Sequence, residues 1–473
     1  KGRHLSLSLS LLFGESSDNK MVSFSSSFVF SLLFLSVLSS PWVNIHGQKI
    51  KHFNNNNNNN NNNKAKLPPP ETSSPSWNLP FYLDPTDQPY GGNVSVFSPN
   101  LLNLFFADKD LGTYNMSPMM SFLNGMWLAT WKNSPTDEDQ AGQRVLYSQS
   151  KDGETWTGIP NSASNPQILF PNISTSSSPV HLFAEPTVLL NNRVYAAASP
   201  KQFCLYPDQY EDVLLLRRVM DDEFDSFGDY FWASFDPPSQ YAENTEYYNI
   251  PSLKDMDPQT IEDVRLLSDP TYAPCDLVKE DGHSNKCEFC LNGCQDWKDV
   301  ENENPTIENE RSHYLLPDGG DVILYRDKSD SLPNWLYSSV RSGPKSEWPP
   351  IEQTNITDDV ANINAGNLPD GRGFLLSNVL VNLVRDPLYL SVTEHDSDNL
   401  HFVNSSVFVS CEWSVFRNLP RQPEGCQYRY LGGGKQGGCQ YSQAVVVNGG
   451  YFYAIFSVNK EDIWIGRVPV SAI

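Results

Sequence analysis

Five segments of the chain share one pattern, in which a two-residue turn of Asn, Asp or Gly precedes a run of mainly apolar residues. Turns of this kind favour β-hairpins because these residues tolerate the backbone that a tight turn requires. We expect each turn to join the first and second strands of a repeated unit. The five segments are Asn124-Gly125-MWLATW, Asn191-Asn192-RVYAAAS, Asp318-Gly319-GDVILYRD, Asp370-Gly371-RGFLLSN and Asn448-Gly449-GYFYAIFS.

The spacing of the turns predicts how many units there are. Their second residues lie at positions 125, 192, 319, 371 and 449, which are 67, 127, 52 and 78 residues apart. The 127-residue gap has the length of two units, so we expect one further turn inside it. A period well above about 40 residues fits a blade of four long strands with loops. The pattern therefore predicts an all-β fold, a six-bladed β-propeller.

Composition agrees with an all-β domain. Aromatic residues make up 12% of the chain, prolines number 35 and glycines 28, and no apolar stripe continues at helical spacing. The stretch 75–473 is long enough to bury one large core, and we assign all of it to the propeller.

A short run at 150–156, Ser-Lys-Asp-Gly-Glu-Thr-Trp, follows the apolar stretch RVLYS. Asp152 can accept hydrogen bonds from nearby backbone amides, Gly153 tolerates a positive φ, and Trp156 supplies an apolar anchor. The run resembles the Asp-box of sialidases and other propeller glycosidases. That resemblance implies a turn between the third and fourth strands of a blade, on the side away from the active site.

Longer runs extend the resemblance over the chain from about 115 to its end. They are similar to BNR-repeat, sialidase-like proteins described as exo-alpha-sialidases, a superfamily that includes hydrolases, lyases and members without known chemistry. The similarity implies a secreted carbohydrate-active protein, a glycosidase acting on terminal, including anionic, sugars. The runs are EDQAGQRVLYSQSKDGETW (138–156), NINAGNLPDGRGFLLSN (362–378), RDPLYLSVTE (385–394) and YSQAVVVNGGYFYAIFSVNKEDIWIGRVPV (441–470).

If each turn joins the first and second strands of a unit, the start of the first strand and the end of the second strand lie on the same face of the propeller. The Asp-box turn then lies on the opposite face. Sialidases use a tyrosine activated by a glutamate, with arginines holding the sugar carboxylate. By resemblance, Tyr441 is the candidate tyrosine and Glu185 of FAEPTVLL is the glutamate that activates it. Asp327 is the candidate acid. The candidate substrate-binding residues on the same face are Arg326, Arg385, Glu310, His313 and Asn364.

The chain also departs from the sialidase pattern. A Phe-Arg-Ile-Pro motif is missing from the start of the propeller, and VYAAAS at 194–199 lacks the arginine of similar strands. The sugar is therefore left open, and two alternatives stand beside the glycosidase. A polysaccharide lyase would use a Tyr or His base and an Arg that neutralises a uronate. A lectin-like propeller would bind sugar without an acid/base pair.

The N-terminal part has a different character. Residues 1–20 resemble untranslated or fragmentary sequence before Met21, and 21–47 contain an apolar run of signal-peptide length, too short to span a bilayer. Residues 48–74 are Asn-rich and then Pro/Ser-rich, which predicts a disordered linker. These features predict a secreted, extracellular protein without stable membrane insertion.

Sequons and cysteines fit secretion. Asn-x-Ser/Thr sites occur at Asn93, Asn115, Asn172, Asn355 and Asn404, and we expect glycosylation there. The eight cysteines are disulfide candidates: Cys204, Cys275, Cys287, Cys290, Cys294, Cys411, Cys426 and Cys439. Four of them crowd into an insertion at about 270–300. A zinc site with His283 is the alternative there, but disulfides are favoured in an oxidising compartment.

The net charge is −23. Nucleic acids and anionic membrane surfaces are disfavoured as partners because long-range repulsion opposes both. An anionic sugar stays open, since a local cluster of cations can override the overall field at contact distance. We expect a carbohydrate or glycoconjugate partner, and neither a cofactor nor a metal.

Overall fold

The computed structural model describes part of the chain, and all of that part falls within one compact unit, Ala65–Ile473. The described residues are 75–77, 95–138, 140–157, 167–173, 181–201, 214–221, 226–235, 250–266, 307–327, 334–343, 346, 348–379, 385–394, 398–411, 428–430, 435, 437–447 and 450–473.

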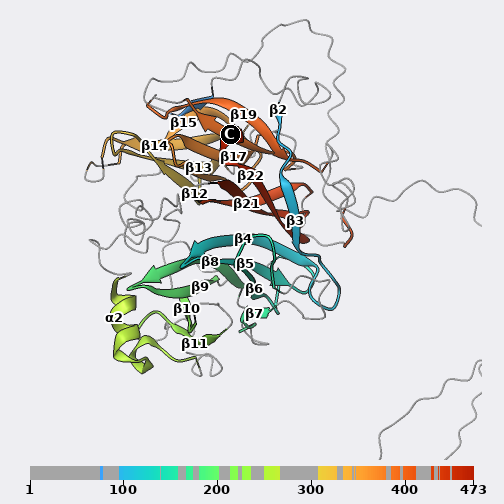
Figure 1. Ribbon diagram of the computed structural model, residues 1–473, viewed down its shortest axis with the longest axis vertical. Helices are drawn as coiled ribbons and strands as arrows, with labels where there is room; N and C mark the ends of the chain where they lie inside the picture. Colours follow the sequence, from blue (N-terminus) through green and yellow to red (C-terminus); the bar gives the residue numbers. More distant parts are fainter. Residues whose placement is uncertain are drawn as a thin grey trace, which may run out of the picture. The chain divides into compact units, whose positions relative to one another are not determined.

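The described residues are mainly β and form five sheets, and within each sheet the consecutive strands of the chain pair antiparallel (Figure 1). We name each sheet by its first strand. The β4 sheet contains β4 (Tyr114–Leu123), β5 (Met126–Ser134), β6 (Arg144–Ser150) and β7 (Gln167–Phe170). The β8 sheet contains β8 (His181–Leu190), β9 (Arg193–Lys201), β10 (Leu215–Val219) and β11 (Phe227–Trp232).

The third and fourth sheets have the same order. The β12 sheet contains β12 (Ile307–Leu315), β13 (Asp321–Asp327), β14 (Asn334–Arg341) and β15 (Glu352–Asp358). The β16 sheet contains β16 (Asn364–Asn367), β17 (Gly373–Asn378), β18 (Leu388–Thr393) and β19 (His401–Val409). Two short N-terminal strands, β1 (Ser76–Trp77) and β2 (Ser95–Val96), add to it by pairing parallel with β19.

The fifth sheet joins two distant parts of the chain. The β20 sheet contains β20 (Cys439–Val447), β21 (Tyr451–Val458) and β22 (Asp462–Pro469), and its fourth strand is β3 (Asn100–Phe105). In the register between them, Ile463 pairs with Phe105 and Arg467 with Asn100. An N-terminal strand therefore completes the last sheet and covers the edge of β22.

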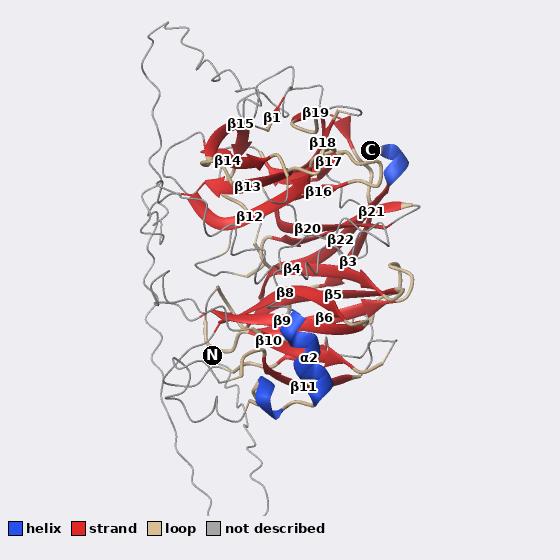
Figure 2. Cartoon of the chain, turned by 90° about the vertical axis from the view of Figure 1, so that its left-hand side faces the viewer, coloured by secondary structure: helices blue, strands red, loops and turns tan. Residues whose placement is uncertain are grey.

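The sheets lie one against the next (Figure 2), and aromatic rings pack between them. Phe452 of β21 meets Phe374 of the β16 sheet with ring centroids 5.1 Å apart. On its other side the β20 sheet meets the β4 sheet, where Tyr453 and Trp127 lie 4.4 Å apart. Neighbouring sheets thus share clusters of buried apolar residues, one between the β16 and β20 sheets and one between the β20 and β4 sheets.

Four of the five predicted turns lie where the sequence placed them, and the fifth, at 448–449, lies outside the described residues. Asn124 and Gly125 join β4 to β5 with φ of 51° and 79°, and Gly319 and Gly371 take φ of 86° and 90° in their own hairpins. The Asp-box turn joins β6 to β7, the third and fourth strands of its sheet, as predicted.

One helix interrupts the sheets. Helix α2 (Pro258–Leu266) and a 3-10 helix (Leu253–Asp255) follow β11, and a second 3-10 helix (Val470–Ala472) follows β22. Asp263 of α2 accepts hydrogen bonds from Arg193 and Tyr195 of β9 at 2.6 and 2.7 Å, which fixes the helix on the β8 sheet. The rest of the 127-residue gap, with the sixth unit and the insertion expected there, lies outside the described residues.

Candidate functional site

Two hydrogen bonds join the first strands of three neighbouring sheets, β4, β20 and β16. The backbone amide of Met120 in β4 donates to Gln443 of β20, and the amide of Ala444 donates to Asn364 of β16 at 3.0 Å. We call the side where the first strands begin and the second strands end the start face. The Asp-box turn lies at the other end of the β4 sheet, as the sequence predicts.

Two buried lysines on the start face converge on one carboxylate. Lys460, in the turn between β21 and β22, places its Nζ 2.8 Å from Oε2 of Glu138. Lys132, near the end of β5, places its Nζ 3.5 Å from Oε1 of the same residue. Lys132 is 0% and Lys460 3% exposed, so both charges are held in the protein interior.

Aromatic rings surround these cations. The Nζ of Lys132 lies 4.0 Å from the ring centre of Phe183, and the Nζ of Lys460 lies 5.5 Å from that of Tyr441 and 5.8 Å from that of Tyr114. The guanidinium of Arg385 lies 5.3 Å from the Tyr441 ring on which Lys460 also rests. We call Tyr114, Lys132, Glu138, Arg385, Tyr441 and Lys460 together the Lys-Tyr cluster.

The electrostatics of the Lys-Tyr cluster follow from burial and crowded positive charge. Burial, reinforced by Arg385 and Lys132, lowers the pKa of Lys460 to about 8, although Glu138 acts in the opposite direction. Burial alone raises the pKa of Glu138, but the two lysines outweigh it and the pKa lies below its usual value. Near neutral pH the cluster thus holds three cations and one carboxylate, an arrangement that favours an anion beside it.

A neighbouring set of charges on the same face is balanced instead. Lys435 pairs with Glu461 at 3.2 Å, and Arg429 bonds to Asp462. Burial raises the pKa of Asp462 to about 7, and Arg429 opposes the rise. Two cations and two carboxylates leave this set without the positive excess of the Lys-Tyr cluster.

Three members of the Lys-Tyr cluster have left-handed backbones. The φ angles are 52° for Tyr441, 54° for Lys460 and 55° for Arg385, which non-glycine residues rarely adopt. Their neighbours hold them there: the carbonyl of Lys460 accepts from Asn115 at 2.8 Å, and the amide of Arg385 donates to Asp359 at 2.8 Å. Such residues concentrate at functional sites because surrounding structure must maintain them.

The structure brings Tyr441 and Arg385 together, as expected, and links them through Gln440. Nη1 of Arg385 donates to Oε1 of Gln440 at 2.7 Å. Arg326 and Asp327 lie at the end of β13, which is also on the start face, and are 4% and 2% exposed. There the amide of Asp327 donates to Asp358, whose pKa burial raises to about 7 against the opposing effect of Arg326.

The other predicted residues have structural partners. Glu185 lies inside β8 and accepts a hydrogen bond from Ser199 of β9. His313 pairs with Ile323 in the interior of β12 and β13, away from the strand start. Asn364, 1% exposed, uses its carbonyl to hold β20. The side chain of Glu310 lies outside the described residues.

The sequence did not single out Tyr114, Lys132 or Glu138. The rule that second strands end on the start face would have identified Lys132, because it follows the run MWLATW directly. Glu138 opens the run 138–156, but no local pattern sets it apart. Its role depends on Lys460, which is 322 residues away in the chain.

One predicted glycosylation site is wrong. Asn115 is 0% exposed, donates to the carbonyl of Glu461 at 2.8 Å and accepts from Asn133 at 2.8 Å. A glycan cannot be accommodated on a side chain enclosed in this way. Asn172 and Asn404 are exposed and Asn355 is partly exposed, while Asn93 lies outside the described residues.

Six of the eight cysteines also lie outside the described residues: Cys204, Cys275, Cys287, Cys290, Cys294 and Cys426. In the part that is described, one group of side chains offers ligand atoms close enough to share a metal ion, Asp386 with Cys411 and Cys439. No helix of that part is long and apolar enough to cross a bilayer.

Comparison with solved structures agrees with this architecture. A sialidase aligns with a TM-score of 0.55 at 20% identity, over 80% of this chain and 33% of its own. The fold is sialidase-like. The chain spans about a third of the length of that sialidase.

Two further sialidases align less closely. A Hadza microbial sialidase has a TM-score of 0.43 at 12% identity, over 79% of this chain and 69% of its own. The Trypanosoma rangeli sialidase in complex with the inhibitor DANA has the same score and identity, over 79% and 60%. No family model and no curated protein matches the sequence.

Proposed function

We propose that the protein is a secreted glycosidase that binds an acidic sugar at the Lys-Tyr cluster. The observation that carries the proposal is the positive excess of this cluster, which faces two tyrosine rings on the start face of a sialidase-like fold. Cations held in place bind a carboxylate strongly because little reorganisation is needed. The six-bladed form of the propeller also belongs to this proposal.

Tyr441 is the proposed nucleophile. Arg385 and Lys460 lie on its ring and would stabilise negative charge that develops on its oxygen during attack on the anomeric carbon. Lys132 and Lys460 would supply the positive charge that attracts the sugar's carboxylate, the role that arginines have in the sialidase pattern. Glu185 and Asp327 stay candidates for activating Tyr441 and for protonating the leaving group.

The test is a panel of sialosides, uronates and neutral glycosides, assayed with the wild type and three variants. Tyr441→Phe should lower kcat by about 10²- to 10⁴-fold, the usual loss when a catalytic group is removed. Lys460→Met should raise KM for acidic sugars by on the order of tenfold, because one charge-assisted bond is lost. Tyr451→Phe, at an exposed ring at the start of β21, is the matched control and should be unchanged.

Other outcomes would change the assignment. An unsaturated product that absorbs in the ultraviolet would make the protein a lyase with Tyr441 as its base. Saturable binding without turnover, unaffected by Tyr441→Phe, would make it a lectin-like propeller. Turnover of neutral glycosides alone would contradict the acidic-sugar proposal.

A further inference from the structure

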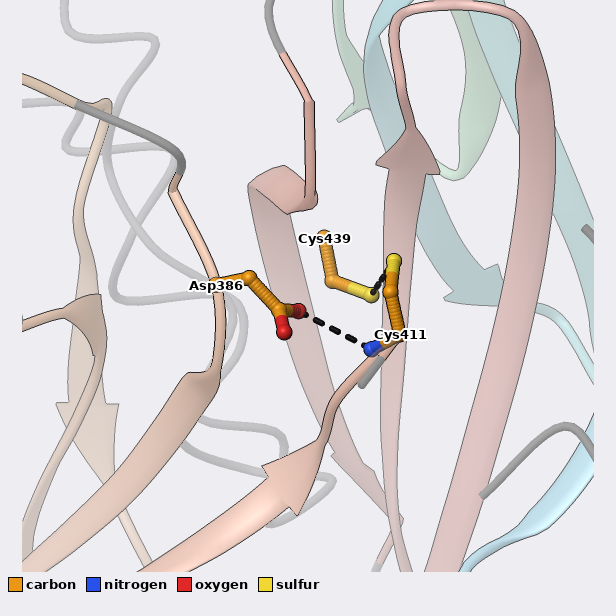
Figure 3. A group of neighbouring side chains, drawn as sticks. All are labelled: Asp386, Cys411 and Cys439. Carbon is orange, nitrogen blue, oxygen red and sulfur yellow. Dashed lines mark hydrogen bonds between the residues drawn. The ribbon is translucent and has the colours of Figure 1, made fainter. Parts of the chain in front are cut away.

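Two cysteines from different sheets meet beside the start face (Figure 3). Cys411 follows the end of β19, and Cys439 is the first residue of β20. Their Sγ atoms lie 3.7 Å apart, and the residues are 7% and 0% exposed (Figure 3). A disulfide needs an S–S separation of about 2.05 Å, so the sulfurs are within a small side-chain rotation of bonding.

The backbone around both cysteines is already fixed. The carboxylate of Asp386 accepts from the amide of Cys411 at 3.0 Å and from the hydroxyl of Ser410 at 2.7 Å. Nδ2 of Asn378 donates to the carbonyl of Cys439 at 2.9 Å and to that of Arg385 at 2.8 Å. The two thiols are thus held together by contacts that do not depend on a bond between them.

A metal ion is the competing explanation for this arrangement. One ligand atom each from Asp386, Cys411 and Cys439 lie within 4.8 Å of one another. A structural zinc site takes four protein ligands. The described residues supply only these three, and both oxygens of Asp386 already accept hydrogen bonds. Because the carboxylate of Asp386 is already hydrogen-bonded and the two thiols are adjacent, a bond between the sulfurs is favoured over a metal ion.

We propose that Cys411 and Cys439 form a disulfide that ties the segment directly after β19 of the β16 sheet to the first strand of the β20 sheet. The two thiols lose two protons and two electrons, and a low-molecular-weight disulfide such as oxidised glutathione accepts them and becomes two thiols. The bond closes the loop 412–438, which contains Cys426. This inference does not depend on the proposed function.

The disulfide positions the Lys-Tyr cluster without touching a substrate. Cys439 is followed directly by Gln440 and Tyr441, and Gln440 bonds to Arg385, the neighbour of Asp386. Fixing the start of β20 therefore fixes the Tyr441 ring relative to the Arg385 guanidinium. In this role Cys411 and Cys439 are positioning residues.

Peptide mapping of the full chain tests the pairing. The protein is folded in a glutathione buffer, alkylated without reduction, freed of N-glycans and digested with trypsin. Cleavage after Arg417, Arg421 and Lys435 places Cys411, Cys426 and Cys439 on three separate peptides. We expect a Cys411–Cys439 linked pair, lighter than the two free peptides by two hydrogens. Cys426→Ser is the matched control and should leave this pair intact.

Hydrogen exchange on the wild type tests the positioning role. Reduction should speed exchange of the Gln440 and Ser442 amides by on the order of tenfold, and amides in the distant β8 sheet should not change. Alkylation of both thiols in the folded protein, a Cys411–Cys426 pair, or one zinc ion bound per chain with both thiols protected would each overturn the proposal. Unchanged exchange after verified reduction would refute the positioning role alone.

Discussion

At the scale of single residues, Lys460 sets the electrostatics of the candidate site. It is buried, lies between two tyrosine rings and pairs with Glu138, and burial with two neighbouring cations lowers its pKa to about 8. Glu138 opposes these effects and so helps Lys460 to keep its charge near neutral pH. The pair therefore decides how much positive charge the Lys-Tyr cluster presents.

Glu138→Gln should lower the pKa of Lys460 further below about 8, because it removes the carboxylate that raises it. The measurement is the pH dependence of Lys460 acetylation, followed by mass spectrometry. Glu154→Gln, which removes the exposed partner of Arg467, is the control and should leave the pH midpoint of Lys460 acetylation unchanged. A midpoint that stays the same or rises in Glu138→Gln would show that Glu138 does not act on Lys460.

The same pKa predicts a pH dependence of stability. The folded-state pKa of about 8 lies below the ordinary value of about 10.4, so the unfolded state binds more protons between these two pH values. The wild type should therefore gain stability relative to Lys460→Met as the pH rises from about 8 to 10.4, by up to about 3 kcal/mol. Urea unfolding at pH 7, 8, 9 and 10 measures this difference, and a flat difference would contradict it.

At the scale of elements, the Asp-box turn shows how a local motif fixes a strand connection. Oδ1 of Asp152 accepts from the amides of Glu154 and Thr155 at 2.8 and 2.7 Å. These bonds lower the pKa of Asp152 to about 2. A Cβ on Gly153 would lie 3.1 Å from Trp127 and from Tyr453, so the turn also packs against the β20 sheet.

Asp152→Ala should reduce the free energy of unfolding by about 1 kcal/mol, as for the loss of a helix cap, because two backbone donors lose their acceptor. Asp152→Asn retains an acceptor oxygen and should lose less. The pKa of Asp152 is depressed in the folded state, so its contribution is present above about pH 4 and is lost as the pH falls towards 2. Chemical unfolding should show that the difference in free energy of unfolding between wild type and Asp152→Ala is smaller at pH 3 than at pH 7.

At the scale of the whole molecule, β3 completes the β20 sheet with residues that lie about 360 positions earlier in the chain. Leu104 of this strand is 0% exposed, in a cluster that also contains Trp131 and Ile455. The N-terminal part of the described chain therefore contributes to the stability of the last sheet.

Leu104→Ala should destabilise the protein by about 2–5 kcal/mol, because it leaves a cavity where two sheets meet. Leu102→Ala, at a partly buried position of the same strand, is the matched control and should cost clearly less. Thermal unfolding followed by circular dichroism at two wavelengths measures both. A similar, small loss of stability in both variants would show that completion of the β20 sheet by β3 contributes little to the stability of the protein.

The sequence by itself determined the hairpins, the Asp-box connection and the all-β class. Each of these depends on residues adjacent in the chain: Gly125, Gly319 and Gly371 adopt a positive φ in their own turns, and Asp152 caps amides two and three residues away. The six-unit count stays a prediction, because the expected extra unit lies outside the described residues.

Only the tertiary structure decided which side chains form the candidate site. Glu138 follows β5 while Lys460 lies in the turn after β21, and their ion pair exists because the β4 and β20 sheets are neighbours. Sequence reasoning placed Tyr441, Arg385, Asp327 and Asn364 on the start face, but it could not show that Lys460 lies against the Tyr441 ring. Ion pairs and burial depend on long-range neighbours, and these arise only when the sheets assemble.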